Sequence, residues 1–543
     1  MKRIIISCLA LILSMSVRPC TNLIVGKGAS KDGSVIVSYS SDDYGAYGYL
    51  FWQPGGKHEP GTMRKLYHYE TNNYLGEIPE ADSTYSVIGL TNEHQLTILE
   101  TTWGGREELE DSTGLFDYGS LMQVTLQRAR TARQAIDVMA GLVEKYGYQS
   151  SGESFTIADA NEVWIMEMIG KGPGGGAPVW VAVRIPDNCI SGHANQSRIR
   201  KFPLKDKANC LYSKDVISFA RSKGYFTGKD KDFSFSEAYN PLDFGGARFC
   251  EARVWSFFNR WGIEDMSLYL DYAMGKTTDN PFPLYIQPKE KLSVQDVKDM
   301  MRDHYEGTPM DVQKDLGMGP YEMPYRPTPL TWEVDGKTYF NERPISTQQS
   351  SCIYVAQLRN FLPDYVGGVL WFGNDEANMV AMVPIYCCTQ GAPECFDEKT
   401  GDTFTFSFKS AFWMQNWVAN MVYLRYNLLF PELYKVRNGL ETAYNEMQPE
   451  VEKNALSMTE AEARKYLSNY SYNQSDKMME AWMQLAQLII VKYNDMAVKK
   501  VDEKGNYIKT PGGVQVPVSR PGYPEHYRRA IVKETGDKYL MKK

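Results

Sequence analysis

The stretch Pro19-Cys20-Thr21-Asn22-Leu23-Ile24-Val25-Gly26 places a cysteine at the start of a run typical of a β-strand. If the chain is cut before Cys20, that residue carries both a thiol and a free α-amino group. An amine with a pKa of roughly 7.7–8 can accept the thiol proton near neutral pH, whereas other cysteine nucleophiles need a histidine. Two alternatives stay open from this stretch alone, a disulfide cysteine and a lipid-anchored cysteine.

The segment before Cys20 has the pattern of a signal peptide. Lys2-Arg3 gives a charged start, and residues 4–17 form an apolar run shorter than the about 20 residues that span a membrane. We therefore predict that residues 1–19 are a signal peptide or propeptide and that the chain is exported to the periplasm, the cell envelope or the medium. Val17-Arg18-Pro19 lacks the small residues that signal peptidases prefer, which favours cleavage by Cys20 itself.

Composition limits the classes of function. The chain has 543 residues, 43% hydrophobic residues and a formal net charge of −7, so it is globular and has no electrostatic footprint for nucleic acid. No segment after residue 20 is long and apolar enough to be a transmembrane helix. Without Cys8 and Cys20 an odd number of the 9 cysteines remains, which excludes a complete disulfide framework. The 6 histidines form no His-Glu-x-x-His motif and there is no Cys-x-x-Cys, so no metal or other cofactor is expected.

Periodicity predicts an α+β chain in two parts. A hairpin of residues 22–25 and 34–39 begins at Cys20, another joins residues 85–90 to 95–100, and helices fill residues 118–146. We expect a core of residues 20–395 and a mostly helical region, residues 396–543, packed on it. Further predicted strands cover residues 154–158, 162–168, 180–185, 351–358, 368–372, 379–385 and 404–408, and further predicted helices cover residues 292–304, 411–429, a segment capped at 457–460, and 477–496.

Several separated motifs occur in an order that resembles one family. They begin with Cys20-Thr21-Asn22 and Gly28-Ala29-Ser30-Lys31-Asp32-Gly33-Ser34. They continue with Gly89-Leu90-Thr91-Asn92-Glu93, Gly152-Glu153-Ser154, Trp180-Val181-Ala182-Val183-Arg184-Ile185-Pro186-Asp187, Ala194-Asn195-Gln196, Leu292-Ser293-Val294-Gln295-Asp296-Val297, Arg302-Asp303-His304-Tyr305-Glu306-Gly307-Thr308-Pro309, Leu358-Arg359-Asn360 and Gly367-Gly368-Val369-Leu370-Trp371. The chain resembles the dipeptidases of peptidase family C69, relatives of choloylglycine hydrolases in the N-terminal nucleophile superfamily.

This resemblance implies a four-layer αββα sandwich with Cys20 at the start of a central strand, acting on dipeptides without metal. It places Asp42 close to the amino group of the nucleophile, where an anion orients and charges that amine. It makes Asn195 the donor to the oxyanion and Asn92 a second polar residue near the scissile carbonyl. A turn-forming role is the alternative for Asp42, Asn195 and Asn92.

The chain departs from the family pattern at Tyr39, where many relatives carry an arginine near the thiol. Tyr39 is therefore assigned to substrate binding together with Arg248, and Arg253 is the alternative to Arg248 as the site arginine. Either arginine could instead be a salt-bridge partner on a helix face. His193 lies near Asn195 in the sequence and is expected to be structural or to line the substrate site.

The leading hypothesis is an exported cysteine dipeptidase that hydrolyses small peptides through an acyl-enzyme on Cys20. An amidase or acylase of the choloylglycine hydrolase type could use the same residues. A surface lipoprotein acylated at Cys20, with no enzymatic activity, is the alternative from another class. The sequence leaves side-chain preference and a homo-oligomeric state open.

Overall fold

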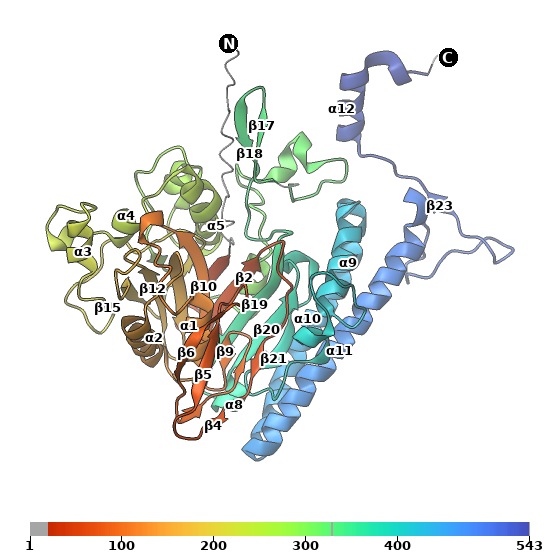
Figure 1. The fold of residues 1–543 in the computed structure, drawn as a ribbon. Helices are drawn as coiled ribbons and strands as arrows, with labels where there is room; N and C mark the ends of the chain where they lie inside the picture. Colours follow the sequence, from red (N-terminus) through yellow and green to blue (C-terminus); the bar gives the residue numbers. More distant parts are fainter. Residues whose placement is uncertain (1–19, 327–328, 542–543) are drawn as a thin grey trace, which may run out of the picture.

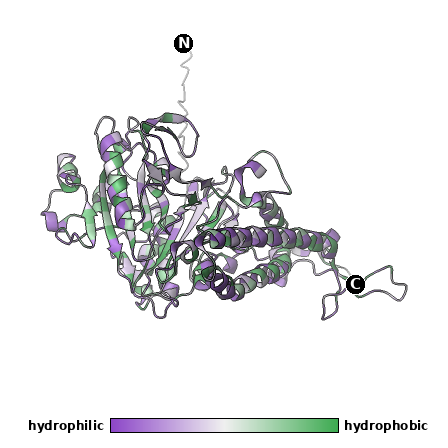
Figure 2. Ribbon diagram, turned by 90° about the horizontal axis from the view of Figure 1, so that it is seen from below, coloured by the Kyte–Doolittle hydropathy of each residue, from purple (hydrophilic) through white to green (hydrophobic). Residues whose placement is uncertain are grey.

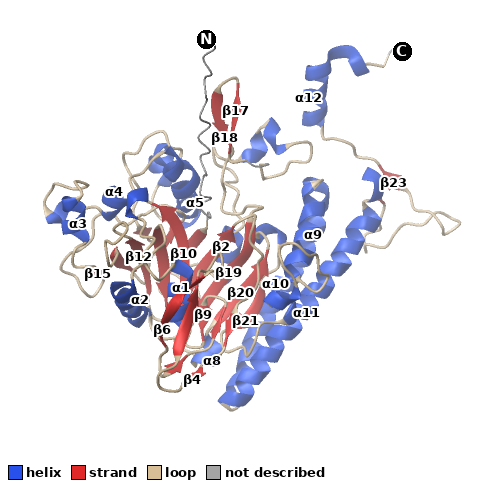
Figure 3. Cartoon of the chain, in the orientation of Figure 1, coloured by secondary structure: helices blue, strands red, loops and turns tan. Residues whose placement is uncertain are grey.

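The computed structural model describes residues 20–326 and 329–541, so the predicted signal peptide lies outside the described residues. The described chain is a mixed α+β fold built on two large antiparallel sheets, which lie between helices in Figures 1 and 3. The first sheet has seven strands in the order β16–β14–β1–β2–β19–β20–β21. These are β1 (Thr21–Val25), β2 (Val35–Asp42), β14 (Ile190–His193), β16 (Tyr285–Ile286), β19 (Ser350–Leu358), β20 (Val369–Asn374) and β21 (Val383–Tyr386).

The second sheet has eight strands in the order β15–β13–β12–β11–β10–β9–β8–β3. It includes the predicted strands at residues 154–158, 162–168 and 180–185, which are confirmed. The strands are β3 (Trp52–Gln53), β8 (Val87–Ile88), β9 (Thr91–Asn92), β10 (Thr97–Gly104), β11 (Gly152–Ala158), β12 (Val163–Ile169), β13 (Val179–Ile185) and β15 (Cys210–Tyr212).

The hairpin predicted at Cys20 is confirmed and occupies the middle of the first sheet. β1 pairs with β2 in the register Thr21 to Ser40, and it pairs with β14 on its other edge. The turn depends on Gly33, whose φ of 83° favours glycine, and on Asp32, whose Oδ1 accepts a hydrogen bond from the Ser34 backbone N–H. Because β1 has a neighbouring strand on each edge and all its residues are buried, the backbone at the start of β1 is held in one position in the core.

Helices cover the outer faces of the two sheets. α1 (Tyr118–Leu126) contacts β10, and α2 (Ala132–Tyr146) contacts β11 and β12. On the other side α7 (Val294–Met300) contacts β2 and β19, and α9 (Ala411–Tyr423) contacts β20. Between the layers of helices, β10 contacts β1 and β2 across the interface of the two sheets. The site residues on β1, β2 and β10 are therefore held between two sheets.

The region after residue 396 is dominated by α9 and two long helices, α10 (Tyr426–Leu456) and α11 (Glu460–Lys492), which contact each other and lie beside the first sheet. Figure 2 shows both hydrophilic and hydrophobic residues along these helices, as expected where one face packs on the protein and the other meets water. The sequence predicted two helices where α11 lies, one capped at residues 457–460 and one of residues 477–496, but α11 is a single helix that continues through residue 477. It begins two residues later than the predicted cap, at a capping box of Thr459 and Glu462.

Two further expectations for this region are wrong. Phe404, Phe406 and Phe408 form no strand; they lie in an exposed loop without a neighbouring strand, and Phe406 packs against Trp413 and Trp417. The alternation of aromatic residues therefore reflects packing on α9. The predicted helix of residues 411–429 is interrupted where Arg425 leaves helical geometry, with φ −148° and ψ 59°.

The remaining elements are short or peripheral. No helix among the described residues is long and apolar enough to cross a membrane. All residues of α12 are at least partly exposed, and Figure 1 shows this helix standing away from the sheets. The other strands and helices are β4 (Gly56–Lys57), β5 (Met63–Tyr67), β6 (Tyr74–Pro79), β7 (Ser83–Thr84), β17 (Thr331–Val334), β18 (Lys337–Phe340), β22 (Val498–Lys499), β23 (Val518–Ser519), α3 (Val216–Ser222), α4 (Phe235–Tyr239), α5 (Ala252–Trp261), α6 (Leu270–Ala273), α8 (Asp364–Gly367) and α12 (Glu525–Thr535).

Candidate active site

Cys20 lies directly before β1, with its side chain between the two sheets. Its Sγ is 3.6 Å from Glu100 Oε1 on β10 and 3.7 Å from the Tyr39 hydroxyl on β2. Burial raises the pKa of the Cys20 thiol well above its ordinary value, and the carboxyl groups of Glu100 and Asp42 raise it further. The thiol is therefore protonated at neutral pH and needs a base to become a nucleophile.

Arg253 joins the backbone of Cys20 to the residues that follow the neighbouring strand β14. Its Nη1 donates to the Cys20 carbonyl oxygen at 2.6 Å and to Thr21 Oγ1 at 2.8 Å. Its Nη2 donates to the Ala194 carbonyl oxygen at 3.0 Å and to Asn195 Oδ1 at 2.9 Å. The planar guanidinium, which is fully buried, thus fixes the backbone of Cys20 relative to Asn195.

The position of Arg253 depends on a local irregularity. The π-helix η3 (Gly246–Glu251) runs directly into α5, and Arg253 is the second residue of α5. Its Nε donates to the Phe249 carbonyl oxygen at 2.8 Å, within the π-helical turn. Single π-helical turns are frequent at functional sites because they redirect side chains that a regular helix would place elsewhere.

Asn195 follows β14 in a left-handed backbone conformation, with φ 62°. Asparagine tolerates this conformation better than most residues, which explains how the chain turns immediately after the strand. Its Nδ2 donates to the Thr102 carbonyl oxygen on β10 at 2.5 Å. With Arg253 on its Oδ1, the amide is held in one orientation beside the start of β1.

Asp42 ends β2 and is fully buried. Its Oδ1 accepts from Ser350 Oγ at 2.5 Å, its Oδ2 accepts from Ser40 Oγ at 3.1 Å, and it forms an ion pair with Arg343. Arg343 was not identified from the sequence. Thr21 pairs with Ser40, so Asp42 lies just beyond that pair on the strand that flanks the backbone of Cys20.

Glu100 is the second residue that the sequence did not reveal. Its Oε1 accepts a hydrogen bond from the Tyr39 hydroxyl at 2.6 Å. Burial raises the pKa of Glu100, and it raises the pKa of Tyr39 well above its ordinary value. Tyr39 therefore stays neutral and supplies a hydrogen bond to Glu100 instead of a positive charge to the thiol. The only available signal was an acidic residue within an otherwise uncharged strand.

Two predicted site residues do not join this group. The side-chain amide of Asn92 is used within the fold: Oδ1 accepts from the backbone N–H groups of residues 94 and 96 in its own turn, and Nδ2 donates to the carbonyl oxygens of Leu126 at 2.7 Å and Ala129 at 2.8 Å. The turn-forming interpretation therefore describes Asn92. Arg248 forms a partly buried ion pair with Glu342, and its guanidinium carbon lies 5.3 Å from the centre of the Phe340 ring. Of the two candidate arginines, Arg253 contacts Cys20.

His193 is a structural residue on β14. One ring nitrogen lies 2.7 Å from Thr101 Oγ1 and the other 2.7 Å from Thr156 Oγ1, so the ring bridges two strands of the second sheet. Burial lowers the pKa of His193 to about 3. A neutral histidine whose two ring nitrogens both lie against hydroxyl groups is a poor proton acceptor.

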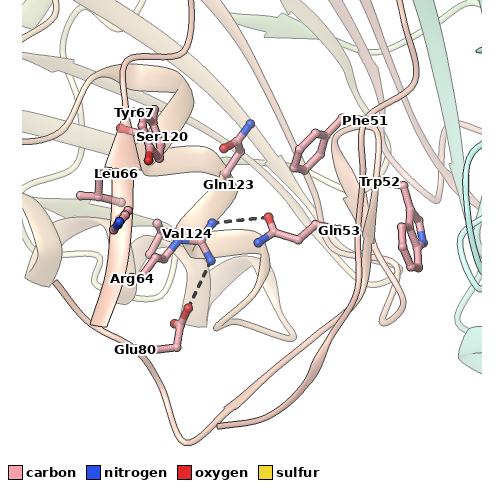
Figure 4. A pocket seen from close by; sticks show the side chains of 11 residues that line it. Phe51, Trp52, Gln53, Arg64, Leu66, Tyr67, Glu80, Ser120, Gln123 and Val124 are labelled. Atoms are coloured by element: carbon pink, nitrogen blue, oxygen red, sulfur yellow. Dashed lines mark hydrogen bonds and ion pairs between the residues drawn. The ribbon is translucent and has the colours of Figure 1, made fainter. Parts of the chain in front are cut away.

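Two pockets elsewhere do not contain Cys20. One, of about 300 Å³, is bounded by β3, β5 and α1, and among its lining residues Arg64 contacts both Gln53 and Glu80 (Figure 4). The other, of about 390 Å³, includes Arg260 and His304. Within residues 20–326 and 329–541, no group of three or more histidine, cysteine, aspartate or glutamate residues is arranged to hold a metal ion.

Comparisons with known proteins agree on one family. The model of peptidase family C69 matches residues 58–438, a range that begins after Cys20 and Asp42. A probable dipeptidase of Salmonella dublin is 27% identical over 68% of this chain and 80% of its own length. Dipeptidase A of Lactobacillus helveticus is 22% identical over 89% of this chain and 98% of its own length. A solved structure, the thermostable penicillin G acylase from Alcaligenes faecalis, aligns with 65% of this chain and 90% of its own at 10% identity and a TM-score of 0.20, which is too low to inform the fold.

Proposed function

The chain belongs to peptidase family C69, and from this premise we propose that it is a dipeptidase whose nucleophile is the thiol of Cys20, exposed as the N-terminal residue after removal of residues 1–19. The names of the curated relatives support the choice of dipeptides as substrates. The observation that carries the choice of nucleophile is the position of Cys20: it begins a central strand, and Arg253 links its carbonyl group to Asn195.

In the proposed reaction the sulfur of Cys20 attacks the carbonyl carbon of the peptide bond while the thiol proton passes to the α-amino group of Cys20. Asn195 donates a hydrogen bond to the resulting oxyanion. The new ammonium group then gives its proton to the leaving amine, and the C-terminal amino acid departs. Water hydrolyses the thioester with the same amine as base, which releases the N-terminal amino acid and restores the thiol.

Asp42 is the counter-ion of the α-amino group in this proposal. The raised pKa of the thiol means that its proton must be removed during the attack, and an amine held next to a carboxylate can take up that proton without creating an isolated buried charge. Arg343 and Ser350 support the role of Asp42 because they hold its carboxylate in place.

The four-layer αββα architecture, the division at residue 395 and export of the chain belong to the same proposal. The contacts between β10 and the hairpin β1–β2, with helices against the outer faces, support the layered arrangement. The packing of α9 on β20 and α11 on β21 supports a helical region attached to the core. Lys2-Arg3 and the apolar residues 4–17 support export.

The test compares wild-type protein, Cys20→Ala and a matched control, Cys210→Ala, which removes another buried thiol at the edge of the second sheet. Intact mass and N-terminal sequencing identify the mature N-terminus, and a panel of dipeptides and acyl amino acids identifies the substrates. We expect a free Cys20 N-terminus and dipeptide hydrolysis in wild type and Cys210→Ala, and no hydrolysis by folded Cys20→Ala. A lipid on Cys20, exclusive cleavage of acyl amino acids, or full activity of Cys20→Ala would contradict the proposal.

A further inference from the structure

Two buried glutamates near Cys20 each have one carboxyl oxygen without a hydrogen-bond donor. Glu100 on β10 and Glu153 on β11 contact each other through their carboxyl groups. Tyr39 donates to one oxygen of Glu100 at 2.6 Å, and Thr102 donates to one oxygen of Glu153 at 2.9 Å. The other two oxygens, Glu100 Oε2 and Glu153 Oε1, are buried and accept no hydrogen bond from an N–H or hydroxyl group of the described residues. Buried acceptors without donors are costly, so this pair is suited to a ligand that brings several N–H groups.

The pair also lacks a cation. In residues 20–326 and 329–541, no lysine or arginine forms an ion pair with either glutamate. Burial raises the pKa of both, and the charge of Glu100 raises the pKa of Glu153 further. Glu70, which accepts a hydrogen bond from the Tyr118 hydroxyl at 2.9 Å, adds a third carboxyl group whose charge acts on the pair. A small cation with several donors satisfies both the charge and the open acceptors.

We propose that Glu100, supported by Glu153, binds the α-ammonium group of the N-terminal residue of the substrate and so selects peptides with a free N-terminus. This inference rests on the dipeptidase function proposed above. In such a substrate the α-nitrogen lies about 2.5 Å from the carbonyl carbon that the sulfur attacks. Because Glu100 Oε1 is only 3.6 Å from Cys20 Sγ, a carbonyl carbon in contact with the sulfur brings the ammonium group within hydrogen-bonding reach of Glu100.

The geometry distinguishes this ammonium group from the α-amino group of Cys20 itself. The backbone of Cys20 continues the plane of the first sheet, where Asp42 lies on the flanking strand β2. Glu100 belongs to the second sheet and lies across the interface, on the side to which the sulfur points. The two acids therefore come from different sheets, and in this proposal each binds one amine: Asp42 that of the enzyme and Glu100 that of the substrate.

The experiment measures discrimination between two substrates that differ only in the α-amino group. The probes are L-Phe-L-Ala and 3-phenylpropanoyl-L-Ala, or the equivalent pair for the best dipeptide of the panel. We expect wild-type kcat/KM to favour the free amine by at least about 10²-fold. In Glu100→Gln this preference should fall below about tenfold, because activity on the dipeptide falls more than activity on the des-amino substrate. Glu108→Gln, an exposed position, should retain the full preference.

The outcomes separate this inference from the proposed function. An unchanged preference in a folded Glu100→Gln variant overturns the inference and leaves the dipeptidase intact. Equal losses on both substrates also overturn it, since Glu100 would then act on the thiol or on the amine of Cys20. If Glu100→Gln does not fold, the test rests on the wild-type ratio of kcat/KM for the dipeptide to kcat/KM for the des-amino substrate. A ratio near one overturns the inference. A wild-type protein that hydrolyses neither substrate and no other dipeptide refutes the proposed function itself.

Discussion

Replacement of Arg253 by lysine keeps the positive charge at the site but removes the planar guanidinium that links Cys20 to Asn195. The guanidinium makes five hydrogen bonds, two from Nη1, two from Nη2 and one from Nε. A lysine ammonium places all its donors on one nitrogen, so it can serve one of the two pairs of acceptors but not both. At least two hydrogen bonds from a charged donor are lost. At about 1.5–3 kcal/mol each, the free energy of unfolding should fall by about 3–6 kcal/mol.

The catalytic effect follows from the same geometry. Arg253 is the common partner of the Cys20 carbonyl group and of Asn195, so Arg253→Lys lets these two residues, the nucleophile and the oxyanion donor of the proposed reaction, move relative to each other. A misplacement of about 1 Å typically costs about 10² in rate, and we expect a loss of that size in kcat.

Urea unfolding followed by tryptophan fluorescence gives the stability, and dipeptide hydrolysis below the unfolding transition gives kcat. Arg221→Lys is the matched control, because Arg221 forms an exposed ion pair with Asp230 and its replacement should cost less than about 1 kcal/mol. If Arg253→Lys unfolds at the same urea concentration as this control and retains wild-type kcat, Arg253 does not organise the site.

Three further predictions concern the other site residues and metal. Asn195→Ala should lower kcat by about 10²–10³ with little change in KM; an effect on KM alone would assign Asn195 to substrate binding. His193→Gln should keep kcat within about tenfold. It should also reduce the loss of unfolding free energy as the pH falls. The pKa of His193 is about 3 in the folded state and 6.5 ordinarily, so below pH 6.5 the wild-type protein takes up a proton at His193 when it unfolds. Between pH 7 and pH 5 the wild type should therefore lose about 2 kcal/mol more stability than His193→Gln in urea titrations, and equal losses would exclude this role. Treatment with EDTA should leave dipeptide hydrolysis unchanged, and a loss reversed by added zinc would point to a metal enzyme.

Local patterns predicted the parts of the fold that depend on neighbours in the sequence. The apolar residues after Cys20, the turn at Gly33 and the helical spacing in α2 each specify a short element on their own, and the structure contains all three. The alternating Phe404, Phe406 and Phe408 misled because a strand also needs a neighbour to pair with, and none is present.

The site was harder to predict because its members approach one another only through packing of the two sheets. Asp42 and Tyr39 were assigned from the resemblance to the family, and both lie on β2, which pairs with the strand that follows Cys20. Glu100 comes from the opposite sheet and Arg343 from a loop just before β19, and no spacing in the sequence connects either to Cys20. Asn92 was assigned to the site because it lies in a matching motif, although its position in a tight turn already accounted for an asparagine there.

The distances along the chain between Cys20 and its neighbours set the timing of its chemistry. Glu100 is 80 residues away, and Arg253 is 233 residues away. A growing chain therefore has a cysteine at position 20 long before it has anything around that cysteine. If the thiol itself releases residues 1–19, the cut can occur only once both sheets and α5 have assembled. The amount of cleaved N-terminus would then equal the amount of correctly folded protein. A chain that does not complete folding would keep residues 1–19 and would hydrolyse no peptides.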